Sequence, residues 1–100
     1  MPTVTKYRNS TIYIDVNITN TGNVTETFQI GCSIIAPNGF ITDLPLQYAT
    51  LSDGANTTKH FSQYNGSATG IGYHTVAVAI YDSDGVELDR DETWRMYVPS

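Results

Sequence analysis

The sequence predicts an all-β protein, an antiparallel β-sandwich of about seven strands formed by a single domain over residues 1–100. Apolar and polar residues alternate with a period of two over several segments, as in strands with one buried face. Turn residues separate these segments every 10–14 residues or so, roughly the spacing of sandwich strands. Ser and Thr number 21 and charged residues make up only 15%, which suits half-exposed strands better than helices.

The first half of the chain contains four expected strands. A short strand over 3–8 precedes a regular alternating strand over 12–19, and a third strand spans 27–36. The weaker pattern over 40–50 contains Pro45. Because proline cannot donate to a β-ladder, it marks an edge strand or a break there.

The second half contains three more expected strands, over 57–64, 73–81 and 93–98. Asp84-Gly85, between the last two, is a strong hairpin signal. The segment Asp15–Thr27 is the most informative part of the chain. It leaves an alternating strand, breaks at Asn20-Thr-Gly-Asn and enters a Thr-rich strand, which predicts a hairpin whose turn fixes the register of its two strands.

One face of each strand supplies the predicted core. The inward rows are Ile12, Ile14, Val16 and Ile18; Phe28, Ile30, Cys32 and Ile34; His74, Val76, Val78 and Ile80; and Trp94, Met96 and Val98. Truncating Phe28 or Trp94 to Ala is expected to cost the most, about 3–5 kcal/mol. Cys32 is the only cysteine, so no internal disulfide forms and we expect a buried, unreactive thiol.

Composition and charge exclude several classes of partner. The net charge is −5 with only two Lys and three Arg, so neither nucleic acid nor an anionic membrane surface is an expected partner. No run of apolar residues is long enough to span a bilayer, so membrane insertion is not expected. Neither is there a signal-peptide pattern, which leaves two alternatives: a domain of a secreted protein, or a small complete protein.

Three stretches resemble a known family. The unit over 12–30 with its Asn20-Thr-Gly-Asn turn, the stretch Leu51–Phe61 and the strand Gly72–Asp82 are similar to CARDB-type and related Ig-like modules of archaeal and bacterial surface proteins. The resemblance covers roughly residues 10–98. It implies an Ig-like (fibronectin/CARDB-type) sandwich with a structural or adhesive role and no catalytic residues. His74 stands where the family usually has Tyr, so no tyrosine-corner hydrogen bond is carried over.

Metal binding and catalysis have little support. The acidic turn offers Asp82, Asp84 and Glu87 as candidate calcium ligands, but the spacing of an EF-hand loop is absent. His60 and His74 lie in different strands without zinc spacing. We expect His60 to be exposed and His74 to be a packed, hydrogen-bonded core residue. No nucleophile motif is present, so we expect no enzyme and no cofactor.

Two surface features remain. Five of the seven asparagines fit the N-glycosylation pattern N-x-[ST]: Asn9, Asn17, Asn23, Asn56 and Asn65. They indicate glycosylation, although Asn and Thr also co-occur in turns and on exposed strand faces. Four tyrosines fall on the outward side of their strands: Tyr13, Tyr73, Tyr81 and Tyr97. They form either a contact platform or merely cross-strand pairs.

These observations favour a non-catalytic structural or adhesive module that binds proteins, or itself, at a cell surface or outside the cell. One alternative is a small virion decoration or minor capsid protein, which needs neither a signal nor a disulfide. A further alternative is a carbohydrate-binding module that takes a glycan on the outward tyrosines.

Overall fold

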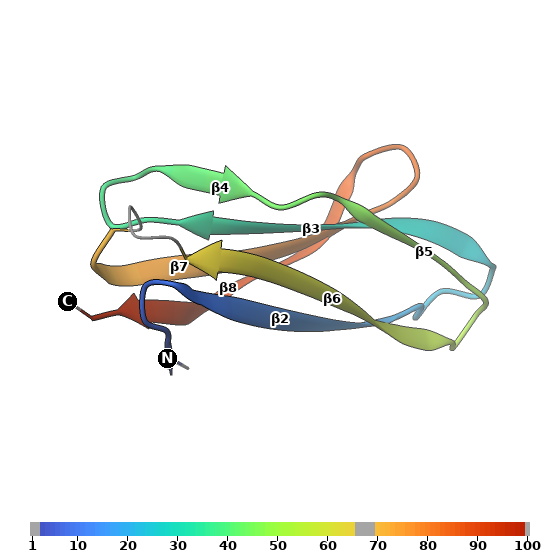
Figure 1. Ribbon diagram of the computed structural model, residues 1–100. Helices are drawn as coiled ribbons and strands as arrows, with labels where there is room; N and C mark the ends of the chain where they lie inside the picture. The colour runs from blue at the N-terminus through green and yellow to red at the C-terminus, as the bar shows by residue number, and fades with distance from the viewer. Residues whose placement is uncertain (1–2, 66–69, 100) are drawn as a thin grey trace.

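The computed structural model describes residues 3–65 and 70–99, and within these it contains eight β-strands and no helix (Figure 1). The all-β prediction is therefore confirmed. The strands are β1 (Thr3–Thr5), β2 (Ser10–Thr19), β3 (Glu26–Ile35), β4 (Ile41–Asp43), β5 (Gln47–Leu51), β6 (Asn56–Asn65), β7 (Gly72–Tyr81) and β8 (Glu87–Val98). They number eight rather than seven because the expected strand over 40–50 is divided at Pro45 into β4 and β5.

The strands form two sheets that pack face to face as a sandwich. The larger sheet has the order β1-β8-β7-β3-β4, with β5 also paired to β3, and the smaller sheet contains only β2 and β6 (Figure 1). One pair departs from the expected antiparallel arrangement, since β1 runs parallel to β8. No hairpin joins these two strands, so connectivity does not force them to be antiparallel.

The prediction of a hairpin at Asp15–Thr27 is wrong, because its two strands do not pair with each other. β2 pairs with β6 over ten residue pairs, from Ser10↔Asn65 to Thr19↔Asn56, whereas β3 pairs with β4, β5 and β7. The turn therefore carries the chain from one sheet to the other. By contrast, the hairpin predicted at Asp84-Gly85 is confirmed: β7 and β8 pair antiparallel, and Gly85 has a φ of 83°, which glycine adopts without strain.

Asn20 explains why the chain turns away from a hairpin. Its side chain is buried, with 2% exposed. Its Nδ2 donates to the carbonyl oxygens of Val24 at 2.9 Å and Leu51 at 3.0 Å, and its Oδ1 accepts from Gly22 N at 3.0 Å. Its backbone N donates to Ala55 O at 2.9 Å. Asn20 therefore ties the β2–β3 connection to the β5–β6 turn at the end of the sandwich.

Side chains from both sheets meet in one core. The predicted inward rows of β2, β3 and β7 are confirmed, with some members only partly buried: Ile14, Val16, Val78 and Ile80. Met96 and Val98 of β8 are buried as predicted. Trp94 is a correction: it follows the same inward row but is 46% exposed. The reason is the unequal size of the two sheets.

A β-bulge in β8 changes the inward row beyond Trp94. Val76 pairs with Trp94 but Val78 pairs with Asp91, which leaves an extra residue on β8. Ile80 then pairs with Asp89. Because directly paired residues share a face of the sheet, Asp89 and Asp91 continue the inward row that apolar side chains form in the rest of β8.

Candidate functional site: a groove between the two sheets

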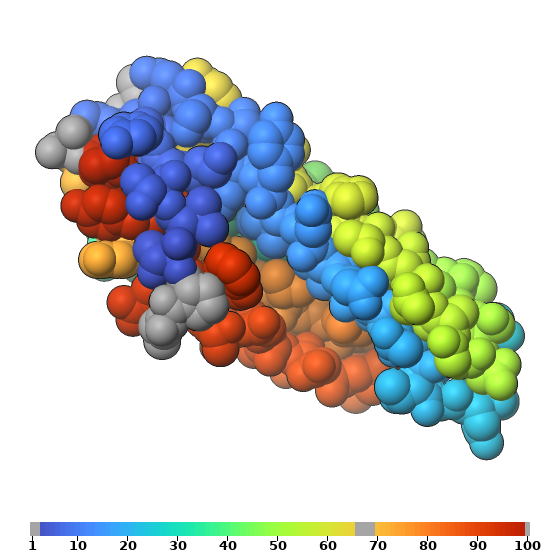
Figure 2. Space-filling model, turned by 90° about the horizontal axis from the view of Figure 1, so that it is seen from below, coloured from blue at the N-terminus to red at the C-terminus, as the bar shows by residue number. Residues whose placement is uncertain are grey.

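An open groove separates β2 of the smaller sheet from β8 of the larger one. Two strands are too few to cover the larger sheet, so part of its inner face stays open to solvent. The groove has a volume of about 500 Å³, within the usual range for ligand pockets. Figure 2 shows it as a hollow between β2 and β8, with β7 beneath it. The residues of β7 that form this floor are Val76, Val78 and Ile80.

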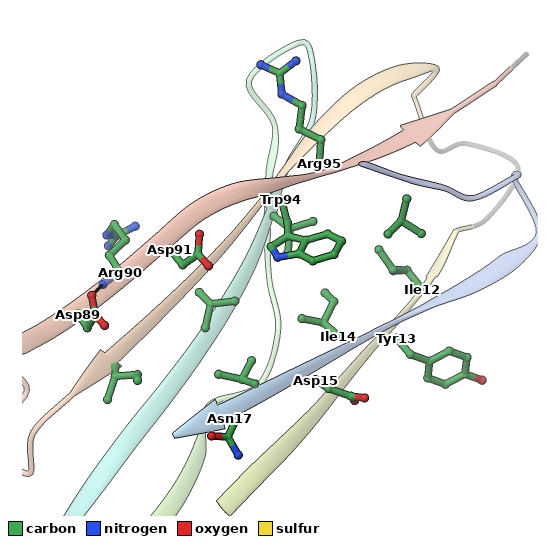
Figure 3. A pocket seen from close by; sticks show the side chains of 15 residues that line it. Ile12, Tyr13, Ile14, Asp15, Asn17, Asp89, Arg90, Asp91, Trp94 and Arg95 are labelled. Carbon is green, nitrogen blue, oxygen red and sulfur yellow. Dashed lines mark hydrogen bonds between the residues drawn. The ribbon is translucent and has the colours of Figure 1, made fainter. Parts of the chain in front are cut away.

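The two walls carry different side chains. From β2, Ile12 and Ile14 point into the groove, while Tyr13 points away (Figure 3). From β8, the indole of Trp94 projects into it, whereas Arg95 points to the other side (Figure 3). A half-exposed tryptophan beside aliphatic side chains is a typical anchor for a partner, because its large apolar surface gains most when water is excluded.

The β8 wall is acidic on the N-terminal side of Trp94. Asp89 and Asp91 line the groove there, and neither forms an ion pair within residues 3–65 and 70–99. Asp91 accepts hydrogen bonds from Thr93 Oγ1 at 2.7 Å and Thr93 N at 2.9 Å, and these bonds lower the pKa of Asp91. Arg90 pairs instead with Glu87 at 2.6 Å and Glu92 at 3.5 Å.

The four candidate tyrosines do not form one platform. Tyr73 and Tyr97 do lie together, with ring centroids 4.8 Å apart, and Arg95 lies 5.6 Å from the centroid of Tyr73. Tyr81 lies at the opposite end of β7, half-buried and paired with Gln29. Tyr13 is 72% exposed but belongs to β2, in the other sheet. The structure thus reduces the predicted platform to the pair Tyr73–Tyr97.

The candidate glycosylation sites also divide. Four of them are exposed: Asn9, Asn17 and Asn56 lie on or next to β2 and β6, and Asn23 lies in the β2–β3 connection. Asn65 is a correction, because it is 2% exposed and its Nδ2 donates to Met96 Sδ at 3.4 Å. A glycan at Asn65 would require this buried amide to leave the core.

The candidate calcium ligands do not converge. Asp82 Oδ1 accepts from the backbone N of Asp84 and of Val86, both at 2.9 Å, so this carboxylate closes the β7–β8 turn. Glu87 pairs with Arg90. In the part of the chain that the structure describes, no group of three His, Cys, Asp or Glu side chains could hold a metal ion, and the calcium site allowed by the sequence is not assembled.

The two histidines lie as expected. His60 is exposed on β6, with Nδ1 2.6 Å from Asp15 Oδ1, and this exposed pair contributes little to stability. His74 is buried, with Nδ1 3.1 Å from Gly72 O. Neither histidine lies on the groove.

Cys32 is buried in the core, as predicted. Burial disfavours the thiolate and raises the pKa of Cys32 from 9.0 to about 11. At neutral pH native Cys32 should therefore react very slowly with a thiol reagent and fully after unfolding, which a colorimetric titration with and without denaturant will measure.

The same shift predicts a pH dependence of stability. Between pH 9.0 and about 11 the unfolded chain loses the Cys32 proton while the folded chain keeps it. The free energy of unfolding should fall as pH rises through this window. Denaturant titrations at several pH values will measure this decrease. In Cys32→Ala the free energy of unfolding should fall less steeply with pH, and an unchanged pH dependence would contradict the prediction.

The groove was missed by sequence reasoning, although Trp94 on its wall was assigned to an inward row. The acidic residues beyond Trp94 were one signal, since Asp89 and Asp91 interrupt an apolar row. Their placement on the inward face depends on the bulge, and no feature of the sequence alone locates that bulge.

Comparisons with known proteins show the fold and no more. No protein-family model matches the sequence, and no curated protein matches it. The fold is similar to the crystal structure of Spo0M, a sporulation control protein from Bacillus subtilis, with a TM-score of 0.54 and 17% sequence identity. The match covers 96% of this chain but 45% of Spo0M, so the chain spans less than half of that protein. Residues 3–65 and 70–99 include no helical segment that could span a bilayer.

Proposed function

We propose that this protein is a non-catalytic structural or adhesive module that binds another protein at a cell surface. The observation that carries the proposal is the open apolar groove with Trp94 on its wall. Apolar floors and half-exposed aromatic anchors are typical of surfaces that gain affinity by excluding water when a partner binds.

The strand connectivity supports the finer class of an Ig-like sandwich. In that class the second and fifth strands pair in one sheet, and the third, sixth and seventh form the other. Here β2 pairs with β6, and β3, β7 and β8 lie side by side in the larger sheet. If β5 is counted as the fourth strand of that scheme, two strands depart from it: β5 pairs with β3, and β1 pairs with β8 in the larger sheet instead of joining β2.

Two further observations support a location at the surface of the cell. Four exposed asparagines carry the glycosylation pattern: Asn9, Asn17 and Asn56 lie on or next to β2 and β6, and Asn23 lies in the β2–β3 connection. Bulky, solubilising glycans there would suit a face exposed outside the cell. The resemblance to CARDB-type modules points to the same location.

Binding to isolated cell envelopes tests this proposal. Purified protein should co-sediment saturably with envelopes of the source organism, and pretreatment of the envelopes with protease should abolish binding. Trp94→Ala should weaken binding at least about tenfold, the effect of a hot-spot aromatic, while Tyr48→Ala, an exposed aromatic outside the groove, should not.

Other results would identify the alternatives. Binding that survives protease but is lost after periodate oxidation of the envelopes would favour the carbohydrate-binding role, and Tyr73→Ala should then reduce it. Co-sedimentation with purified virus particles and not with envelopes would favour the virion role. Either result would contradict the proposed function.

A further inference from the structure

β2 has one unused edge. It pairs only with β6, and no other strand in the described residues lies against its opposite side. Asn20 N bonds to Ala55 O, which places the even-numbered residues of β2 in the hydrogen-bonded pairs with β6. In an antiparallel pair the intervening residues turn their backbone groups the other way. The N–H and C=O groups of Tyr13, Asp15 and Asn17 therefore face the unused edge, beside the groove.

This edge has less protection than the edges of β6 and β8, although Asp15 places one charge on it. The outer edge of β6 is covered in part by Gln47, whose Nε2 donates to His60 O at 2.6 Å. β8 is paired with β1 at Arg95–Tyr97, and the remainder of its edge carries a bulge and a series of charges. Bulges and charges prevent unwanted pairing at sheet edges. β2 has a regular ten-residue register, no proline and no lysine.

The groove lies directly beside this edge, because residues of β2 form one of its walls. An added strand would lie about 4.8 Å from β2, in the plane of the smaller sheet, above the open face of β7 and β8. Alternate side chains of that strand would point down onto Val76 and Val78 and against Trp94. The apolar side chains of the added strand would cover the part of the larger sheet's inner face that β2 and β6 leave open.

The negative charge of Asp89 and Asp91 determines which charged side chains the added strand needs. Asp89 and Asp91 are spaced two residues apart on the inward side of β8, so side chains two residues apart on the added strand would face them. A second copy of this protein is a poor occupant, because it would bring a net charge of −5 and a second set of the same aspartates. Like charges across an interface suppress such pairing.

We propose that β2 takes up an extended segment of a partner protein as an added strand. The segment alternates apolar side chains that fill the groove with outward polar ones, and carries basic side chains two residues apart that face Asp89 and Asp91. This proposal rests on the protein-binding function above and specifies the chemistry of its partner. Main-chain hydrogen bonds to β2 supply affinity, and the groove and carboxylates supply specificity.

A synthetic peptide provides the test. The probe is Val-Thr-Val-Thr-Val-Thr-Lys-Thr-Lys. A second peptide has the same residues in reversed order, because the added strand can run parallel or antiparallel to β2 and the experiment determines which direction binds. Trp94 is the only tryptophan, so its fluorescence reports on the groove directly. One of the two peptides should produce a saturable blue shift. Its forms with Glu for both Lys, or with the three Val contiguous, should bind at least about tenfold more weakly.

Backbone methylation of the peptide separates strand addition from simple apolar contact, without any change to the protein. Methyl groups on every second peptide nitrogen block the bonds to β2 in one series and point away from β2 in the other. One series should lose binding and the other should retain it. Equal binding by both series, or no fluorescence change with either peptide direction, would overturn the proposal.

Protein variants give an independent check. Asp15→Pro removes an N–H at the unused edge, where proline is tolerated, and should weaken peptide binding at least about tenfold. Asp15→Ala is the matched control, since it also loses the His60 contact but keeps the N–H, and should bind like wild type. Asp89→Asn with Asp91→Asn should reduce both the affinity and its dependence on salt.

The outcomes also distinguish this proposal from the proposed function. If binding to envelopes is sensitive to protease but unaffected by Asp15→Pro, the protein-binding function stands and strand addition is overturned. If ultracentrifugation shows a wild-type dimer that Asp15→Pro converts to monomer, the occupant is a second copy and the choice of partner is overturned.

Discussion

Asn20→Ala should be among the most destabilising single substitutions in this protein. It removes the two donor bonds to Val24 O and Leu51 O and the acceptor for Gly22 N. The bond to Leu51 O is buried, and a buried carbonyl left without a donor costs about 1–3 kcal/mol by itself. We expect a total loss of about 3 kcal/mol in the free energy of unfolding, measured by urea titration monitored by circular dichroism.

Two variants test the cause of that loss. Asn38→Ala removes an exposed turn bond, to Phe40 N at 3.0 Å, and should cost less than about 1 kcal/mol. Asn20→Asp has nearly the same shape but places a carboxylate oxygen against the carbonyl oxygens of Val24 and Leu51, so it too should be strongly destabilising at neutral pH. An Asn20→Asp protein as stable as wild type would show that the Asn20 amide does not stabilise the β2–β3 connection.

Phe28→Ala and Trp94→Ala should differ sharply, although both residues were expected to be core aromatics. Phe28 is buried between the sheets, and its truncation should cost about 3–5 kcal/mol. Trp94 is about half exposed on the wall of the groove, so its truncation should cost less, about 1–2 kcal/mol. Denaturant titrations of the two variants, compared with wild type, will measure the difference.

Phe40→Ala is the matched control for removal of a phenyl ring, because Phe40 is exposed. It should change the free energy of unfolding by no more than about 0.5 kcal/mol. A Trp94→Ala protein as unstable as Phe28→Ala would mean that the groove is closed in solution, and would remove the main support for both functional proposals.

Much of the fold follows from the alternation of side chains along the sequence. The rows on β2, β3 and β7 were predicted with their correct inward faces, because a strand with one buried face must repeat every two residues. Asp84-Gly85 was correctly assigned to a hairpin, since its turn chemistry is local. Pro45 was expected to mark either an edge strand or a break, because it lacks an N–H, and the structure has the break, between β4 and β5.

The candidate site was much less predictable. Tyr13 and Tyr73 both alternate outward, but they lie on different sheets, and the period alone cannot tell one sheet from the other. Asn65 fits the glycosylation pattern yet is buried, because its amide meets Met96 of the opposite sheet. Trp94 was placed in the right row, but its exposure depends on how many strands lie above it.

The sequence by itself determined that this protein is built of strands, where most of them begin and end, and which face of most is apolar, since these properties depend on neighbours along the chain. Only the tertiary structure decided which strands pair. Asn20 directs the chain across the sandwich, so β2 pairs with β6 rather than β3. That pairing leaves a sheet of two strands against a larger one, and the groove with Trp94, Asp89 and Asp91 is the uncovered remainder.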